Sequence, residues 1–195
     1  MDSEKRPIDR LLVGVSASIA ILSLPSYLAY LRATLAREVR VIMTPKAAEL
    51  LAPSTVALLC DGVFLDGISP QKRPGHMELA RWCEMFLVLP ASADVLGQAA
   101  NGLAPNLLTT AVLASPRPVI FCPNLTDVMW SKKSVQRNIG TLREDGHVVI
   151  DPELAMAYEV DAGEMQKSWI VLDPETLGER LLEIHHQDPH LPTDR

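Results

Sequence analysis

Met85-Phe86-Leu87-Val88-Leu89-Pro90-Ala91-Ser92-Ala93-Asp94 is the stretch of sequence that decides the fold. Its apolar run from Met85 to Leu89 is short enough for a buried strand, and Pro90 ends that run. Small residues follow, and Asp94 is expected to cap the next helix. A strand that opens a helix in this way leaves backbone N–H groups pointing outward, where α/β proteins hold anionic or polar ligands. The stretch predicts a ligand-binding turn, with an ordinary strand–turn–helix as the competing interpretation.

The composition suits one α/β domain with a sizeable core, because the chain has 195 residues of which 48% are hydrophobic. A net charge of −6 gives no general attraction to nucleic acid or to an anionic membrane, so neither is expected as a partner. The three cysteines have no CxxC spacing, so neither a disulfide framework nor a metal site is expected. The charged first ten residues are unlike a secretory signal, and no apolar run reaches about 18 residues. A cytoplasmic protein is expected.

Candidate strands alternate with candidate helices along the chain. The apolar runs predict strands over 11–15, 38–43, 85–89, 119–122 and 147–150. Helical patterns cover 19–37, 46–51, 53–59, 76–84, 106–114, 129–143 and 174–185, and Pro25 predicts a kink or a late start in the first. This alternation predicts a Rossmann-like or flavodoxin-like, doubly wound parallel sheet in a single domain over 1–195. Three segments lack periodicity: 64–75 is predicted as a loop, 151–169 as a mobile flap and 186–195 as a disordered tail.

Hydroxyl residues follow three of the predicted strands. Ser16 and Ser18 follow the first strand, Thr44 the second, and Ser92 the central one. The sequence around Gly14 is neither a GxGxxG dinucleotide loop nor a P-loop, which would require a lysine. Because the carboxyl ends of parallel strands meet at one sheet edge, the hydroxyls are expected to line a mononucleotide pocket there. Helix capping is the alternative role for each of them.

Two further features are ambiguous on their own. His76 opens an amphipathic turn, and lone histidines are more often surface or structural residues than catalytic ones. The segment 123–130 contains proline, asparagine, threonine and aspartate, which favours a turn, and its Met129 and Trp130 are typical of a helix core.

Taken together and in this order, these pieces resemble the homo-oligomeric flavin-containing cysteine decarboxylases. Within that family the chain is most similar to the peptidyl-cysteine decarboxylases that modify ribosomal peptides of the epidermin type. The resemblance runs from about residue 11 to about residue 184. The motifs that carry it are Ser16-Ala17-Ser18-Ile19, Pro90-Ala91-Ser92-Ala93, Ala100-Asn101-Gly102, Asn106-Leu107-Leu108-Thr109-Thr110 and the segment from Pro123 to Met129-Trp130.

The resemblance implies a cofactor, an assembly and a set of site residues. The cofactor is expected to be FMN, with FAD in some members, bound where the subunits of a trimer or dodecamer meet. His76 falls where the family places its active-site histidine. The residues expected to bind the cofactor are Ser16, Ser18, Thr44, Pro90, Ala91, Ser92, Ala93 and Asp94, and those expected to bind substrate are Asn101, Leu125, Thr126, Asp127 and Met129.

The chain departs from the family pattern at two places. Asp94 replaces an asparagine, and Leu125 and Thr126 replace methionine and asparagine. In the family the second asparagine is thought to contact the substrate carboxylate, and Thr126 offers one hydrogen-bond donor where the amide offers two. Asp94 could cap its helix or accept a hydrogen bond from a flavin N–H.

The resemblance also implies a reaction on the C-terminal cysteine of a precursor peptide. The cysteine loses two electrons to oxidised flavin, the resulting thioaldehyde acts as an electron sink, and loss of CO₂ then leaves an enethiol. His76 is the expected acid/base, and the 151–169 flap is expected to close over the substrate and exclude water.

Other activities remain open at this point. A phosphopantothenoylcysteine decarboxylase adds a reduction for which the family uses a flap cysteine, and 151–169 contains none. A flavin prenyltransferase shares the fold but performs no redox step. A non-catalytic regulatory flavoprotein would bind a protein partner instead of a peptide substrate.

Overall fold

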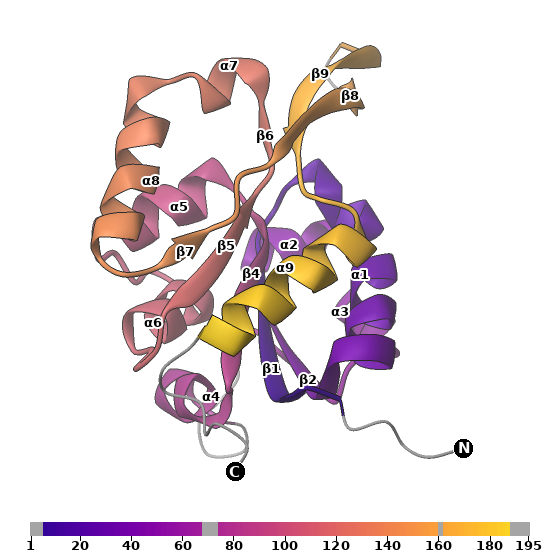
Figure 1. Cartoon of the computed structure of the whole chain (residues 1–195), viewed down its shortest axis with the longest axis vertical. Coiled ribbons are helices and arrows are strands. Elements are labelled where there is room, and N and C mark those ends of the chain that lie inside the picture. Colours follow the sequence, from indigo (N-terminus) through magenta and orange to yellow (C-terminus); the bar gives the residue numbers. More distant parts are fainter. Residues whose placement is uncertain (1–5, 68–73, 160–161, 188–195) are drawn as a thin grey trace.

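The core of the protein is a six-stranded parallel sheet. The computed structural model describes residues 6–67, 74–159 and 162–187. The strands lie in the order β3-β2-β1-β4-β5-β7, which is the order of dinucleotide-binding folds and confirms the predicted doubly wound sheet (Figure 1). Their bounds are β1 Ile8–Val15, β2 Ala36–Met43, β3 Gly62–Phe64, β4 Met85–Ala91, β5 Val119–Pro123 and β7 Val148–Val149.

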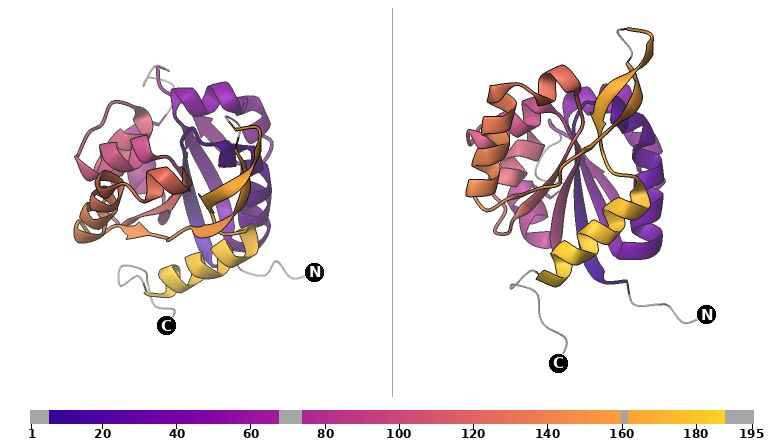
Figure 2. Two further views of the ribbon diagram at one scale, coloured as in Figure 1. Left: turned by 90° about the horizontal axis from the view of Figure 1, so that it is seen from above. Right: turned by 45° about the horizontal axis from the view of Figure 1, so that its top comes forward.

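Helices cover both faces of the sheet (Figure 2). One face carries the 3₁₀ turn η1 (Ile19–Ser23), α1 (Leu24–Tyr30), the π-helical turn η2 (Leu31–Leu35), α2 (Pro45–Leu50), α3 (Pro53–Val56) and α9 (Pro174–Gln187). The other carries α4 (His76–Trp82), α5 (Ala93–Ala100), α6 (Leu107–Leu113) and α8 (Lys133–Glu144).

The central strand β4 separates the two hydrophobic cores. Leu87 and Leu89 are buried on the α1 and α9 side, while Phe86 and Val88 are buried on the α5 and α6 side. Every residue of β4 is buried, and such burial on both faces is why its sequence reads as a continuous apolar run instead of an alternating one.

A topological switch point lies between β1 and β4. From β1 the chain winds outward to β2 and β3, then crosses back to β4 on the other side of β1. The connections that leave the carboxyl ends of β1 and β4 therefore run in opposite directions, and a crevice forms between them.

A small antiparallel sheet stands above this crevice. It consists of β6 (Leu125–Thr126), β9 (Glu164–Ile170) and β8 (Glu153–Glu159), and the short helix α7 (Asp127–Trp130) follows β6. The segment 151–169, predicted as a flap without regular structure, is therefore mostly a β-hairpin that projects from the domain (Figure 2). The sequence of β8 does not show the usual alternation of buried apolar and exposed polar residues. One face carries exposed apolar side chains such as Met156, and the other carries small residues such as Ala155.

Several predicted boundaries are wrong for local reasons. The pattern over 19–37 is split into η1, α1 and η2, and β2 already begins at Ala36; the late helix start predicted at Pro25 is confirmed, because α1 begins at Leu24 with Pro25 in its first turn. The pattern over 129–143 is interrupted at Ser131 and Lys132, between α7 and α8. Ser92, not Asp94, is the N-cap of α5.

Two other predictions concern the irregular segments. The loop predicted over 64–75 begins inside β3, which at three residues is too short to show a pattern; its residues 68–73 lie outside the described part. The predicted disordered tail overlaps α9 at residues 186 and 187, and its remainder, 188–195, also lies outside that part.

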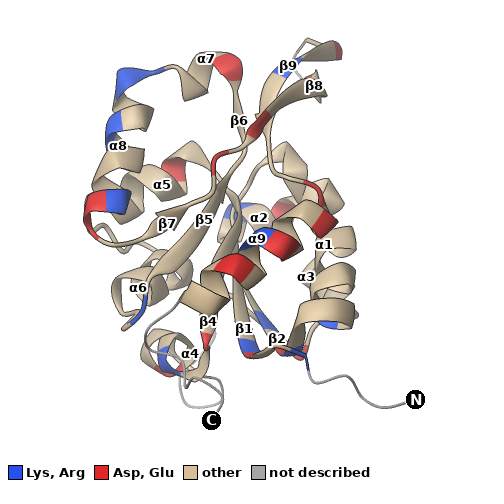
Figure 3. Cartoon of the chain, in the orientation of Figure 1, with Lys and Arg blue, Asp and Glu red and all other residues tan. Residues whose placement is uncertain are grey.

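Charged residues are spread over the surface without one dominant cluster in the view of Figure 3. Among the described helices, none is both long and apolar enough to cross a bilayer.

Candidate functional site

A cavity of about 550 Å³ lies at the switch point, below the hairpin. Its floor comes from the residues after β1, β4 and β5, and its roof from β8 and β9. The polar side chains that line it include Ser18, Ser23, Ser92, Asn124, Thr126 and Ser168, and the apolar ones include Ile19, Leu22, Leu125, Met129 and Ile170. Six of the predicted site residues therefore lie together here: Ser18, Ser92, Ala93, Leu125, Thr126 and Met129.

Ser16 lies beneath this cavity and does not line it. Its hydroxyl is buried, donates to the Pro90 carbonyl oxygen at 2.8 Å and accepts from the Ser92 N–H at 2.8 Å. Pro90 and Ala91 are the last residues of β4, and both are buried. Ser16 therefore fixes the turn that presents Ser92, whose own hydroxyl accepts from the Val95 N–H and caps α5.

Asn124 connects the floor of the cavity to its roof. Its Oδ1 accepts from the Ser18 hydroxyl, and its Nδ2 donates to the Trp169 carbonyl oxygen of β9 at 3.2 Å. The sequence prediction missed this residue, because the family pattern over 123–130 specifies no residue type at position 124. A polar residue directly after a buried strand was the available signal.

Tyr27 supports the cavity wall beside the end of β9. It is buried, and its hydroxyl donates to the Leu172 carbonyl oxygen at 2.8 Å. Burial is the main reason that the pKa of Tyr27 is raised to about 12.

The segment 125–129 forms one side of the cavity. Thr126 pairs with Ser168 of β9, and its hydroxyl accepts from the Met129 N–H at 3.3 Å, which caps α7. Asp127 does not line the cavity; its Oδ1 accepts from the Trp169 indole N–H at 2.9 Å.

Three predicted residues lie at other positions. Thr44 is buried as the N-cap of α2, where its hydroxyl accepts from the Ala47 N–H at 3.3 Å. Asp94 is exposed and accepts from the Gln98 side chain at 2.9 Å. Asn101 is exposed and donates to the Gly97 carbonyl oxygen at 2.8 Å. The predicted pocket at the sheet edge therefore exists, but Ser16 and Thr44 do not line it.

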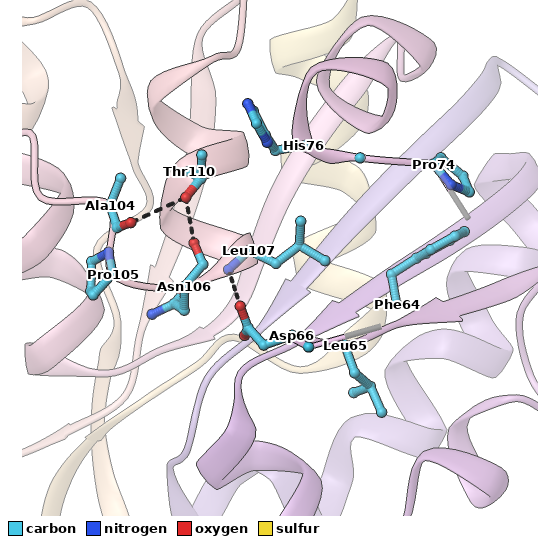
Figure 4. Close-up of a pocket in the computed structure, with 12 residues that line it drawn as sticks. Phe64, Leu65, Asp66, Pro74, His76, Ala104, Pro105, Asn106, Leu107 and Thr110 are labelled. Carbon is cyan, nitrogen blue, oxygen red and sulfur yellow. Dashed lines mark hydrogen bonds between the residues drawn. The ribbon is translucent and has the colours of Figure 1, made fainter. Parts of the chain in front are cut away.

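His76 lines a second cavity, of about 290 Å³, with no lining residue in common with the first. This cavity lies between the end of β3 and the starts of α4 and α6 (Figure 4). Asp66 closes one side, where its Oδ1 accepts from the Leu107 N–H at 2.7 Å. The His76 ring points away from Asp66, which is the one carboxylate among the described residues that line this cavity (Figure 4).

The cysteines do not contribute to either cavity. Cys83 and Cys122 are buried and Cys60 is half-buried, and burial raises the pKa of all three thiols. The described residues contain no cluster of histidine, cysteine, aspartate or glutamate suited to a metal ion.

Comparison with known proteins identifies the family. The model of the flavoprotein family matches residues 1–174. The chain belongs to the flavoprotein family. This flavoprotein is 42% identical to the mersacidin decarboxylase of Bacillus sp. (strain HIL-Y85/54728) over 166 residues, which are 85% of each chain. It is also 32% identical over 184 residues to the coenzyme A biosynthesis bifunctional protein CoaBC of Haemophilus influenzae, covering 93% of this chain but 45% of that one.

A solved relative contains a peptide. The structure of an EpiD variant complexed with the substrate peptide DSYTC superposes with a TM-score of 0.81 at 26% identity, covering 89% of this flavoprotein and 98% of that chain.

The larger cavity of this flavoprotein has the donor set that a flavin mononucleotide requires. Ser18 and Ser92 are the N-caps of η1 and α5 and both line the cavity, so it offers two hydroxyls at helix starts, the kind of group that binds a phosphate. Ile19, Leu22 and Met129 provide apolar surface for an aromatic ring system. The residues therefore fit a flavin.

Proposed function

We propose that this flavoprotein carries out the oxidative decarboxylation of the C-terminal cysteine of a ribosomally made precursor peptide, giving an aminoenethiol. The main support for this proposal is the cavity at the switch point, where hydroxyl and amide groups face the β-hairpin that forms its roof. The 42% identity of the chain to a mersacidin decarboxylase supports it as well. The proposed cofactor is FMN, with FAD as the alternative, and the proposed location is the cytoplasm, where precursor peptides are made.

The floor and roof of the cavity suit a peptide carboxylate. Asn124, Thr126 and Ser168 lie around one end, and each has a group that can donate a hydrogen bond after small side-chain rotations. Ala157 on the roof leaves room for a peptide, and the hairpin shields it from water. Although Thr126 replaces the family asparagine, an amide lies two residues earlier at Asn124, and it has a second N–H besides the one that it donates to Trp169.

The reaction balances as the loss of CO₂ and two hydrogens from the terminal cysteine. When bound, FMN supplies the two-electron acceptor for the Cα–Cβ–S unit. The chain itself orients the cysteine, holds its carboxylate and moves protons; we assign the proton transfer to His76.

This assignment requires two copies of the chain. His76 and Asn124 line separate cavities of one chain, so we propose that the imidazole of one subunit completes the larger cavity of another within a trimer or dodecamer. Exposed apolar side chains border both cavities, namely Ile19 and Leu22 at one and Met77 next to His76 at the other, as an interface would require.

A mixing experiment tests this assembly. His76→Asn and Asn124→Ala subunits should each form inactive oligomers, and unfolding and refolding them together should restore part of the activity. Mixtures that stay inactive, or light scattering that reports only monomers, would contradict the shared site.

A phosphopantothenoylcysteine decarboxylase is the weaker candidate, despite the similarity to CoaBC. That reaction ends with reduction of the enethiol, for which the family uses a flap cysteine. The three cysteines of this chain lie at 60, 83 and 122, outside the hairpin. Incubation with peptides ending in cysteine separates the two reactions by mass: the oxidative product is about 46 Da lighter, and the reduced product about 44 Da lighter.

A further inference from the structure

Trp169 is held by three residues of the segment after β5. The Asn124 side chain donates to its carbonyl oxygen at 3.2 Å, and Asp127 accepts from its indole N–H at 2.9 Å. The Trp130 ring stacks on the Trp169 ring with centroids 5.2 Å apart and planes at 29°. The hairpin is therefore fastened near its base by backbone, carboxylate and aromatic contacts at one residue.

The register of the small sheet connects this fastening to the cavity. Trp169 pairs with Leu125 in β6 and with Leu154 in β8, while its neighbour Ser168 pairs with Thr126. Adjacent strand residues point to opposite faces, so the Trp169 ring lies on the outer face and Ser168 faces the cavity. A displacement of β9 at Trp169 would therefore shift Ser168 and, across the strand pair, Ala155 of the roof strand β8.

We propose that Asp127 is a positioning residue, which sets the height and tilt of the hairpin over the cavity through the Trp169 indole and does not touch the substrate. The inference rests on the proposed decarboxylase function. It differs from the expectation that Asp127 binds substrate, because its carboxylate is engaged with Trp169 outside the cavity. A hydrogen bond to a carboxylate is stronger than a neutral one, so its removal should release the hairpin measurably.

Three variants isolate this contact. Asp127→Ala removes the acceptor, Trp169→Phe removes the indole N–H but keeps an aromatic ring, and Asp127→Asn retains an oxygen acceptor. We expect the first two to raise KM for a peptide ending in cysteine about tenfold with little change in kcat, as loss of one charge-assisted hydrogen bond implies. Asp127→Asn keeps a neutral oxygen acceptor and should lie between the parent and Asp127→Ala, and Asp127→Ala combined with Trp169→Phe should be no worse than either alone.

Glu144→Ala is the matched control. It also removes one carboxylate, from the exposed last turn of α8, and among the described residues no hydrogen bond or ion pair involves that side chain. It should leave KM, kcat and flavin content unchanged.

A measurement that does not depend on enzyme activity tests the role of Asp127 separately from the proposed decarboxylase function. In the flavin-loaded protein, hydrogen–deuterium exchange over 153–159 and 164–170 should be about tenfold faster in Asp127→Ala and Trp169→Phe and unchanged in Glu144→Ala. If the parent decarboxylates no peptide, the proposed function fails, and exchange alone still decides whether Asp127 holds the hairpin.

Three results would overturn the proposal. One is a raised KM in Asp127→Ala with a parent-like Trp169→Phe, which would mean that Asp127 binds substrate directly. Another is a loss of kcat at unchanged KM. The third is parent-like exchange and kinetics in both variants.

Discussion

The Ser16 hydroxyl holds the Ser92 backbone across the switch point, accepting its N–H at 2.8 Å while donating to the Pro90 carbonyl oxygen at 2.8 Å. The two serines are far apart in the chain, and the contact joins the ends of β1 and β4. The turn that presents Ser92 to the cavity is thereby fixed by a buried side chain that does not line the cavity.

Ser16→Ala should therefore act through the turn. It removes the acceptor of the Ser92 N–H, while the Pro90 carbonyl oxygen still accepts from the Ser16 backbone N–H at 3.3 Å, and one unsatisfied polar group costs about 1–3 kcal/mol. We expect a lower free energy of unfolding in urea and weaker retention of FMN on dialysis. Unchanged stability together with lost FMN would instead place Ser16 in direct contact with the cofactor.

His76→Asn tests the assignment of proton transfer. The asparagine has a similar size but cannot act as a base near neutral pH, so the decarboxylation rate should fall by about 10²-fold or more. Flavin content by absorbance and oligomer mass by light scattering should match the parent. A colourless variant would make His76 a cofactor ligand, and a fully active one would make it a surface residue.

Two helical glycines should respond in opposite directions to alanine. At Gly178 in α9 an added Cβ would lie 2.6 Å from the Tyr30 ring, while at Gly140 in α8 no described atom lies within 4 Å. Alanine gains about 0.5–1 kcal/mol in a helix, but overpacking costs about 1–3 kcal/mol. Gly178→Ala should lower the urea midpoint and Gly140→Ala should raise it; equal shifts would contradict the tight α1–α9 contact.

His147 should make the protein less stable in acid. Burial lowers the pKa of His147 from its ordinary 6.5, although Asp145 opposes this, and its Nδ1 accepts from the Val119 N–H at 3.1 Å. As the pH falls through 6.5 the unfolded state binds the proton first, so the free energy of unfolding decreases. His147→Asn cannot titrate, and its urea midpoint should change less between about pH 7.5 and about pH 5. An identical pH dependence of the urea midpoint in the parent and in His147→Asn would show that His147 does not cause the loss of stability in acid.

The sequence predicted those features that depend on local pattern. The apolar run before Pro90 and the hydroxyl residues after the strands were sufficient to place Ser92 at the carboxyl edge of the sheet, where it lines the larger cavity, since parallel strands end together. Ser16 and Thr44 share that edge but not the cavity, because the direction of a hydroxyl depends on partners elsewhere, such as Pro90 for Ser16 and the first turn of α2 for Thr44.

Features that depend on distant contacts could not be predicted. The hairpin over 153–170 owes its position to Trp169 and to residues more than 35 positions earlier, Asn124, Asp127 and Trp130. Asp127 reads as a motif residue in sequence, and only the register of β9 against β6 reveals the indole as its partner.

An anaerobic single turnover tests the central claim most directly. The FMN-loaded protein is mixed with an equimolar peptide ending in cysteine, and the flavin absorbance and the peptide mass are followed in the same sample. We expect bleaching of the flavin together with a peptide about 46 Da lighter, and no such loss of mass for the same peptide with a C-terminal amide, which cannot release CO₂. A peptide that stays intact, or a loss of about 44 Da with the flavin still oxidised, would contradict the claim.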